Sequence, residues 1–268
     1  LGLSTIVTYE VLNTISQLEG CHMLNNLTHS KLHDLGLNGM ARALALQLEQ
    51  PQMSQLMFED RLGLLLDAEI SSRDTRRIDR LLKAARLRQG GACLEDVDYR
   101  PARQLDRATM MALADCNWIP RRQNLILTGA TGTGKSWLAC AFGKQACRTG
   151  YTVNYTTATQ LFEDLMSAQA EGSLPKLRRK LIRTQLLIID DLGIGGIDIN
   201  IGPILLEIID QQSAQGSLII TSQFPGSKWY DLFNDPTIAD AILDRIVHRA
   251  HVIELKGESI RKLKAKGV

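Results

Sequence analysis

The segment GATGTGKS, residues 129–136, constrains the fold of this chain more than any other feature. It matches the pattern G-x-x-x-x-G-K-[S/T] in full, and it lies between an apolar stretch, NLILTG, and a helical stretch that begins GKSWLACAF. A loop of this kind wraps backbone N–H groups around phosphates, and the N-terminus of the following helix adds positive potential. The sequence therefore predicts a phosphate-binding loop between a strand and a helix.

A buried strand that ends in two acids supplies the second half of the predicted site. Four apolar residues precede Asp190 in LLIIDDL, so this acid is expected at the carboxyl end of the strand, where it can hold Mg²⁺ together with the Ser136 hydroxyl. Asp191 is then placed to orient or activate a water molecule, although two acids after a strand also occur in ordinary turns. The predicted residues for ATP with Mg²⁺ are Gly129, Ala130, Thr131, Gly132, Thr133, Gly134, Lys135, Ser136 and Asp190.

From Asn124 onward, short apolar stretches alternate with helical ones. Strands are predicted in NLILTG, TVNYTT, LLIIDDL, SLIITSQ and HVIELK, with one or two helices between successive strands. Strands separated in this way form a parallel sheet covered by helices on both faces, so the predicted fold class is α/β. At the end of SLIITSQ, Gln223 is the favoured of three polar residues that could sense a γ-phosphate.

The sequence before residue 115 reads as helices. We expect an N-terminal helical domain over residues 23–115, ahead of a nucleotide-binding domain over 116–268. LNGMARALALQLEQ repeats apolar residues at helical spacing, and a second helix, QLMFEDRLGLLLDAEI, is predicted to carry one apolar face. That face consists of Leu62, Leu65, Leu66 and Ile70.

A third helical stretch, RDTRRIDRLLKAARLR, carries two parallel stripes, one apolar and one of arginines, about 140° apart around the helix. One face can be buried while the other presents guanidinium groups to phosphates, so DNA contact is expected there. The alternative is a solvated face whose arginines pair with neighbouring acids. The arginines are Arg73, Arg76, Arg77 and Arg80.

The overall composition excludes few classes of fold or function. A chain of 268 residues with 44% hydrophobic residues and a formal net charge of +2 is typical of a packed globule, and its charge alone does not indicate nucleic acid. No apolar run approaches the roughly 18 to 20 residues of a membrane span, and residues 1–22 lack the basic start of a secretion signal, so a cytoplasmic location is expected. Five widely spaced cysteines favour reduced, mostly buried thiols.

One late arginine has two possible roles. Arg245, in AILDRIVHR, could stabilise transition-state charge in a neighbouring subunit, or it could pair with Asp240 or Asp244 of its own helix. Arg249, one turn further on, is a second candidate for the same role. The residues alone leave these choices open.

Several of these segments together resemble the IstB family, the ATPase partners of bacterial insertion-sequence transposases. They are GATGTGKS, LLIIDDLG, ITSQFP, the arginine-rich helix and the run DPTIADAILDRIVHRAHVIELKGESIR. The family is in turn similar to DnaC-type helicase loaders within the AAA+ ATPases. The resemblance covers residues 27–262, and the run over 235–261 is its most specific part.

The resemblance implies an AAA+ sheet with the strand order 5-1-4-3-2, an N-terminal domain that contacts DNA, and oligomers that use ATP on duplex DNA to deliver a target site to the transposase. By position it implies phosphate and Mg²⁺ contacts at Lys135 and Ser136, a Mg²⁺-holding acid at Asp190, the catalytic position at Asp191 and an arginine finger in trans at Arg245. It also places an inserted DNA-contacting helix at KLRRKLIR. The candidate DNA-binding residues there are Lys176, Arg178, Arg179 and Lys180.

The chain departs from the wider class in three places. Most AAA+ ATPases have glutamate where Asp191 stands. The sequence after HVIELK leaves no room for a full helical lid, so little or no C-terminal lid is expected and a nucleotide-sensing role for Arg261 is left open. Residues 1–22 have no counterpart in the family and carry no functional prediction.

The leading hypothesis is a DNA-binding ATPase that assists transposition, with ATP closing subunit contacts and hydrolysis releasing them. The alternative is a replicative helicase loader, which shares the ATPase half. A small-molecule kinase would need an acceptor pocket and a basic lid, for which the sequence shows no candidate. A non-hydrolysing DNA scaffold stays open because of the aspartate at residue 191.

Overall fold

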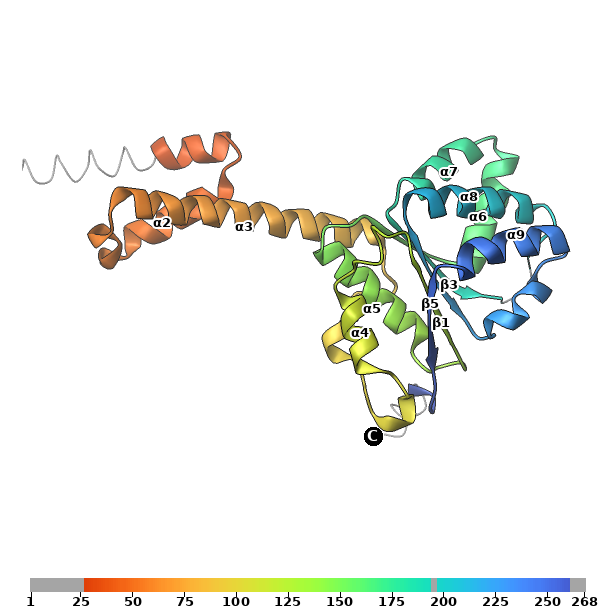
Figure 1. Cartoon of the computed structure of the whole chain (residues 1–268). Coiled ribbons are helices and arrows are strands. Elements are labelled where there is room, and N and C mark those ends of the chain that lie inside the picture. The colour runs from red at the N-terminus through yellow and green to blue at the C-terminus, as the bar shows by residue number, and fades with distance from the viewer. Residues whose placement is uncertain (1–26, 194–196, 261–268) are drawn as a thin grey trace, which may run out of the picture. The chain divides into compact units, whose positions relative to one another are not determined.

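A computed structural model describes residues 27–193 and 197–260 of the chain (Figure 1). Its contacts divide the chain into two compact units, Leu1–Arg77 and Ile78–Val268, and each is described by itself. The leader over residues 1–22 and Arg261, whose sensing role the sequence leaves open, lie outside the described residues.

The described part of the first unit is helical. After a helical segment over residues 27–34, its elements are α2 (Asn38–Glu49), a 3-10 turn (Pro51–Gln55) and α3 (Phe58–Ala85). α3 is one continuous helix of 28 residues, which corrects the expectation of two separate helical stretches. No glycine or proline occurs between Leu64 and the end of α3, so no residue type interrupts the helix. None of the described helices has the length and apolarity needed to cross a membrane.

A close backbone contact joins α2 to α3 at Gly39. A Cβ atom added there would lie 2.6 Å from the carbonyl oxygen of Ala68 and 2.7 Å from the Cα atom of Glu69, so the approach needs glycine. Oε2 of the buried Glu69 accepts hydrogen bonds from the N–H groups of Gly39 (2.7 Å) and Met40 (3.2 Å). The carboxylate thus accepts from two backbone N–H groups in the first turn of α2, where negative charge is also favourable.

The apolar face predicted for the first half of α3 is largely open to solvent. Leu62, Leu66 and Ile70 are 36%, 49% and 59% exposed. Leu65 is half-buried, and the side chains that α3 buries in the first unit are Glu69 and Ser72, which hydrogen-bond to residues of α2. Polar contacts and a close backbone approach therefore join α2 to α3.

The second unit is built on a five-stranded sheet with the order β2-β3-β4-β1-β5. All neighbouring strands are parallel. The order is the predicted 5-1-4-3-2 counted from the other edge, so the predicted topology is confirmed. The strands are β1 (Asn124–Gly129), β2 (Val153–Thr157), β3 (Leu186–Leu192), β4 (Ser217–Ser222) and β5 (Ala250–Leu255).

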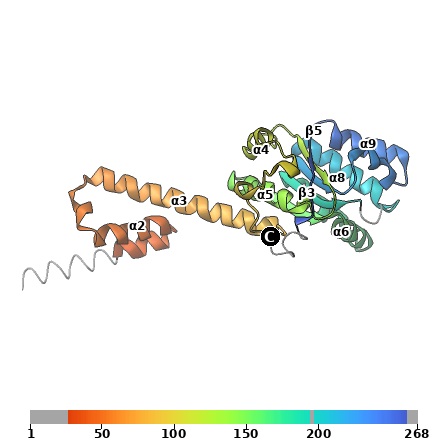
Figure 2. The same ribbon diagram turned by 90° about the horizontal axis from the view of Figure 1, so that it is seen from below.

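Helices cover both faces of this sheet, and Figures 1 and 2 show them as two layers. Side chains alternate across the sheet, so Leu125 and Leu127 of β1 belong to one apolar core and Ile126 to the other. The first core is covered by α4 (Arg107–Ala114) and α5 (Lys135–Arg148). The second is covered by α6 (Ala158–Ala170), α7 (Leu174–Ile182), α8 (Ile201–Gln215) and α9 (Pro236–Val247).

Residues 78–115 pack within the second unit. Ala85, Ala92 and Met110 are at most 3% exposed and belong to the same apolar core as α5. The predicted domain boundary after residue 115 therefore falls inside a compact unit whose contacts begin at Ile78. The assignment of DNA contact to one domain and ATP hydrolysis to the other stays a prediction.

Asn124, the first residue of β1, links three elements. Its side-chain Nδ2 donates to the carbonyl oxygens of Arg245 (3.2 Å) and Ile246 (3.0 Å) near the end of α9. Its Oδ1 accepts from the N–H of Leu218 in β4 (2.9 Å). Because Asn124 is only 2% exposed, these bonds are shielded from water and hold α9 firmly to the start of the central strand.

Candidate nucleotide-binding site

The phosphate-binding loop connects β1 to α5, as predicted. β1 is buried from Asn124 to Thr128, and α5 begins with Lys135 after the N-cap residue Gly134. Gly134 has a φ of +96°, a conformation that other residues rarely adopt. A Cβ atom on Gly129 would lie 2.3 Å from the carbonyl oxygen of Leu255. The backbone therefore requires glycine at both glycine positions of the pattern.

The two polar side chains at the start of α5 point to phosphate chemistry. Lys135 is 4% exposed, and its Nζ atom donates to the carbonyl oxygens of Gly129 (2.9 Å) and Ala130 (3.0 Å). Ser136 is half-buried beside it. The loop thus presents an ammonium group and a hydroxyl group next to the N-terminus of a helix, which is a favourable setting for an anion.

Asp190 lies fully buried near the end of β3. Its Oδ2 atom accepts a hydrogen bond from the Tyr155 hydroxyl (2.6 Å), and its Oδ1 atom accepts one from the Thr221 hydroxyl (2.5 Å). Burial, and then the hydrogen bond to Asp190, raise the pKa of Tyr155 well above its usual range, so the phenol stays a neutral donor. Two neutral hydroxyls therefore fix the orientation of this carboxylate.

Asp191 has an unusual backbone conformation. Its φ is +59°, in the left-handed region, and the pairing of β3 with β4 shifts register between Ile189 and Leu192. The Asp191 N–H donates to Oγ1 of Thr221 (2.8 Å), the same hydroxyl that donates to Asp190. Backbone strain of this kind persists only where surrounding contacts enforce it and is concentrated at functional sites. A single threonine hydroxyl thus positions both acids.

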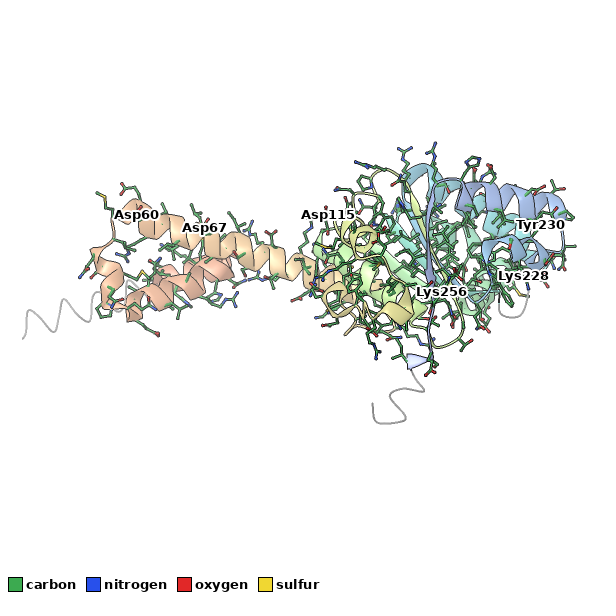
Figure 3. All side chains as sticks on the ribbon, turned by 60° about the horizontal axis from the view of Figure 1, so that its bottom comes forward. Asp60, Asp67, Asp115, Lys228, Tyr230 and Lys256 are labelled. Atoms are coloured by element: carbon green, nitrogen blue, oxygen red, sulfur yellow. The ribbon has the colours of Figure 1, made fainter. Side chains whose placement is uncertain are left out.

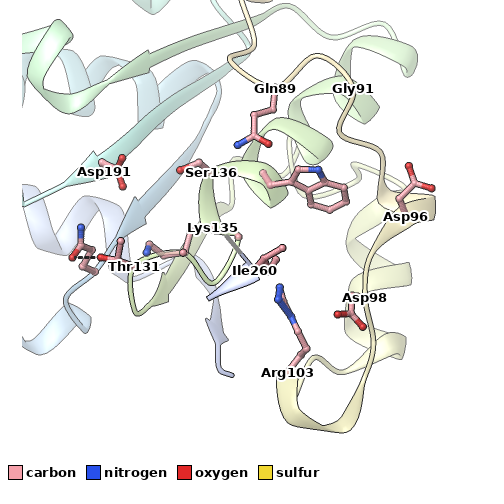
Figure 4. Close-up of a pocket in the computed structure, with 14 residues that line it drawn as sticks. Gln89, Gly91, Asp96, Asp98, Arg103, Thr131, Lys135, Ser136, Asp191 and Ile260 are labelled. Atoms are coloured by element: carbon pink, nitrogen blue, oxygen red, sulfur yellow. Dashed lines mark hydrogen bonds between the residues drawn. The ribbon is translucent and has the colours of Figure 1, made fainter. Parts of the chain in front are cut away.

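Gln223 follows β4 and reaches the phosphate-binding loop. Its side-chain oxygen accepts a hydrogen bond from the Thr131 hydroxyl (2.8 Å), drawn as a dashed line in Figure 4. The loops after β1 and β4 therefore meet at this contact, because the two strands are neighbours and parallel. The structure thus brings the residue favoured for sensing a γ-phosphate to the loop.

These side chains surround one cavity of about 670 Å³. Figure 4 shows Lys135, Ser136 and Asp191 on one side of it. On the other side lie residues of the segment that joins α3 to α4, residues 86–106, which we call the connector. Asp190 is not among the described lining residues. The lining consists of Gln89, Gly91, Asp96, Asp98, Arg103, Thr131, Gly132, Gly134, Lys135, Ser136, Trp137, Asp191, Gln223 and Ile260.

Half of this lining was missed by reasoning from motifs. No site residue is predicted from the sequence in the connector, yet its residues Gln89, Asp96, Asp98 and Arg103 line the cavity opposite the loop. The only sequence signal was an acidic segment, LEDVDY, next to a proline and two arginines. This segment matches no motif. Its residues line the cavity only because the folded chain brings them next to α5, which the sequence alone does not show.

Arg245 lies on α9 and does not line the cavity in the described part of the chain. Its Nε atom donates to Oδ1 of Asp210 on α8 (2.5 Å), and Nη1 donates to the carbonyl oxygen of Ala241 (2.8 Å). The pairing partner is thus Asp210 rather than the two acids considered on α9. Arg249 is exposed. The assignment of either arginine as a finger in trans stays a prediction.

The arginine stripe of α3 is exposed along its length. Within the first unit, Arg73 bonds to Glu69 (2.8 Å), Arg76 donates to the Ser72 hydroxyl (3.2 Å), and Arg77 is also solvent-exposed. Within the second unit, Arg80 is exposed as well. Nearer the start of α3, Figure 3 shows acidic side chains at Asp60 and Asp67. Positive charge is therefore concentrated in the second half of α3.

The second basic segment, α7, carries three exposed cations and one that is engaged. Lys176, Arg179 and Lys180 are exposed, and they line an open groove on the surface of the second unit. Arg178 is 25% exposed and forms an ion pair with Glu207 of α8. The exposed cations of α7 are thus the ones positioned to meet an external anion.

Solved structures share the fold of the second unit. DnaA of Aquifex aeolicus bound to AMPPCP superposes with a TM-score of 0.53 at 20% identity, covering 66% of this chain and 55% of that one. The DnaC helicase loader superposes with a TM-score of 0.53 at 18% identity, covering 62% of this chain and 97% of that one. The sheet order, the phosphate-binding loop and these likenesses give the second unit the AAA+ type of P-loop fold.

Sequence comparisons give the family. The family model of the IstB-like ATP binding protein matches residues 30–267. An insertion sequence ATP-binding protein of Sinorhizobium fredii is 45% identical over 240 residues, or 90% of this chain and 98% of that protein. The ATP-binding protein of insertion sequence IS1162 of Pseudomonas fluorescens is 46% identical over 205 residues, or 76% of this chain and 89% of that protein. The chain belongs to the IstB-like ATP-binding family, which confirms the resemblance found in the sequence.

Proposed function

We propose that this protein is a DNA-stimulated ATPase that oligomerises on duplex DNA and helps a transposase to select its target during insertion-sequence transposition. ATP closes the contacts between subunits, and hydrolysis releases them. The protein acts in the cytoplasm, with DNA, the cognate transposase and further copies of itself as its partners.

The observation that carries this proposal is the convergence of four polar side chains on one cavity. Lys135, Ser136, Asp191 and Gln223 line it, although they come from the ends of three different strands. Parallel strands bring their carboxyl ends to one edge of the sheet, which is where α/β proteins bind nucleotides. Cation, hydroxyl, acid and amide are the groups that phosphoryl transfer to water requires.

Each group has a role in hydrolysis. Lys135 binds the β and γ phosphates, and the loop backbone binds the remaining oxygens. Ser136 and Asp190 are the residues that would hold Mg²⁺, since hydroxyl and carboxylate oxygens are the ligands that this ion prefers. An ion held there would neutralise charge on the phosphates. Asp191 orients the attacking water, and Gln223 responds to the γ-phosphate through its position beside Thr131.

A neighbouring subunit completes the site. Because Arg245 lies outside its own cavity, we assign it to the cavity of the next subunit, where it stabilises charge on the transferred phosphoryl group. Its bond to Asp210 then breaks on assembly, or shifts enough for the guanidinium to reach across. Hydrolysis by this scheme depends on oligomers.

DNA binding rests on exposed cations rather than on base recognition. The stripe of α3 and the cations of α7 present guanidinium and ammonium groups of the kind that contact DNA phosphates. Phosphate contacts give affinity that is independent of sequence and falls steeply with salt. A target-site helper that works on many sequences needs binding of this kind. Support for the transposase partner comes from the relatives, which are named as insertion sequence proteins.

The decisive experiment measures ATP hydrolysis with and without duplex DNA, alongside particle size with a non-hydrolysable ATP analogue. We expect DNA to raise turnover, and the analogue to produce large assemblies only when DNA is present. A DNA affinity that does not change between ATP, ADP and no nucleotide would contradict the proposed coupling. Absence of phosphate release with DNA present would instead favour a non-hydrolysing scaffold.

The alternative of a replicative helicase loader shares the ATPase unit. The likeness to the DnaC loader is at 18% identity and concerns the fold alone. A pull-down that recovers the replicative helicase, and not the transposase, would favour the loader.

A further inference from the structure

Arg103 is a buried cation at the cavity that no motif accounts for. It ends the 3-10 turn Pro101–Arg103, it is 8% exposed, and it lines the cavity opposite Ser136. Its Nη2 atom donates to the carbonyl oxygen of Thr133 in the phosphate-binding loop (2.7 Å). Its Nε atom is buried without a hydrogen-bond partner. In Figure 4 the guanidinium reaches from the connector toward the loop.

Arg103 has no carboxylate partner among the described residues. Asp98, which lines the same cavity, is bound by Arg100 through bonds of 2.7 and 2.9 Å, and the pKa of Asp98 is lowered first by Arg100, with Arg103 as a later cause. A buried guanidinium without a counter-ion is costly, so an anion bound at the cavity would offset part of that cost. The anion that the adjoining loop is built to take is a phosphate chain.

The contact also determines how one peptide group of the loop is oriented. The carbonyl oxygen of Thr133 and the N–H of Gly134 belong to the same planar trans peptide, so they point in opposite directions. Since Arg103 holds the Thr133 carbonyl, it directs the Gly134 N–H away from the guanidinium and so fixes the orientation of this peptide. N–H groups are the groups by which such loops bind phosphates. The positive φ of Gly134 allows this orientation.

We propose that Arg103 is a positioning residue for the nucleotide phosphates, which holds the Thr133–Gly134 peptide with its N–H toward the phosphate chain and adds a buried positive charge beside it. The proposal rests on ATP binding at this cavity and deepens the proposed function. It assigns part of the affinity for phosphates to the connector. It also predicts that a nucleotide without phosphates gains nothing from this arginine.

The test compares ATP, ADP and adenosine on the full-length chain, with binding measured by displacement of a fluorescent ADP. Arg103→Met keeps the length of the side chain and removes its charge and donors. Arg107→Met is the matched control, because Arg107 is exposed on α4 and does not line the cavity. Thermal unfolding without nucleotide checks that both variants fold.

We expect Arg103→Met to weaken ATP and ADP by roughly tenfold or more, as for loss of a hydrogen bond to a charged group, while adenosine is unaffected. Arg107→Met should match the parent for all three ligands. Parent-like affinity for ATP in Arg103→Met, or an equal loss for adenosine, would overturn the proposal. If the parent chain itself fails to bind ATP, the proposed function falls together with the role of Arg103.

Arg103→Lys keeps the test decisive if the methionine variant does not fold. Lysine retains the charge but lacks the planar, multi-donor guanidinium, so the carbonyl of Thr133 is held less well. In this variant we expect the affinity for ATP to be roughly threefold or more lower than in the parent, while the affinity for adenosine stays the same. Affinity equal to the parent would show that the orientation of the peptide does not depend on Arg103.

Discussion

At the scale of single residues, the acid pair depends on hydroxyl groups that no motif includes. Asp190 is a buried carboxylate, and such a group needs donors for its oxygens. Tyr155 and Thr221 supply them, and Thr221 also accepts from the N–H of Asp191. The geometry of both acids therefore depends on two neighbouring strands, β2 and β4, as much as on β3 itself.

Replacement of Tyr155 by phenylalanine tests this dependence. The loss leaves one oxygen of Asp190 without its donor, so we expect the free energy of unfolding to fall by about 1–3 kcal/mol and a higher Mg²⁺ concentration to be needed for half-maximal turnover. Denaturant unfolding and Mg²⁺ titration measure the two effects. Tyr151→Phe removes a phenol from the same unit without touching the acid pair. Equal Mg²⁺ requirements in both variants would contradict the role of Tyr155.

Replacement of Arg245 by alanine tests the site shared between subunits. We expect nucleotide binding to be preserved and DNA-stimulated turnover to fall by about 10³-fold, because an arginine finger acts on the transition state. Arg249→Ala, a few residues further along the chain, should retain most of the turnover. If Arg249→Ala loses turnover while Arg245→Ala retains most of it, the arginine finger is Arg249.

At the scale of helices and strands, the second unit is predictable because its patterns are local. The central strands NLILTG, LLIIDDL and SLIITSQ are buried apolar stretches, whereas β2 and β5 at the edges are only partly buried, and all five predicted strands are found in the sheet. The long α3 was predicted in two pieces because its apolar pattern changes face, and only the absence of glycine and proline shows that the backbone continues. Its exposed Leu62 and Ile70 could not be foreseen, since the contact at Gly39 depends on another helix.

The residues of the site divide in the same way, into those that local sequence predicts and those that only the fold brings together. The loop and acid pair could be predicted, because each occupies consecutive residues with defined chemistry. Arg103 and Asp98 could not, because they reach the cavity only through the path of the connector. Likewise, the partner of Arg245 is Asp210, which is distant in sequence and becomes a neighbour only when α8 packs on α9.

The exposed cations of α7 give a prediction at this scale. Lys176→Gln with Arg179→Gln removes two charges from the groove, so duplex DNA should bind more weakly. The slope of log K against log salt should become shallower by up to about 0.9 for each DNA phosphate that the variant no longer neutralises. Arg121→Gln with Arg122→Gln removes two exposed charges that precede β1 and serves as the control. An unchanged salt slope in the α7 variant would exclude this helix from the DNA interface.

At the scale of the whole molecule, the limits of the nucleotide-binding unit have a measurable consequence. The connector and α4 supply core residues, such as Ala92 and Met110, and the connector also supplies part of the cavity wall. A chain cut at residue 116 would lose them, whereas one cut at residue 78 would keep them. The compact unit that carries the cavity is therefore larger than the stretch from the phosphate-binding loop onward.

We expect the fragment 78–268 to unfold cooperatively and to bind ATP, and the fragment 116–268 to do neither. Each large apolar side chain withdrawn from the core removes about 1.5–3 kcal/mol, and several are withdrawn together. Calorimetry and nucleotide titration on the two fragments measure this. Cooperative unfolding of the shorter fragment with normal ATP affinity would instead support the predicted boundary at residue 115.

The hydrogen bonds of Asn124 have a consequence for how subunits would communicate. One end of β1 carries the loop that grips a subunit's own nucleotide, and the other end is fastened to α9, which bears the arginine assigned to the neighbour. Because β1 connects the loop rigidly to α9, neither end of the strand can shift alone. A change at one nucleotide would then rotate the whole unit, and in a ring or filament that rotation would pass from one subunit to the next.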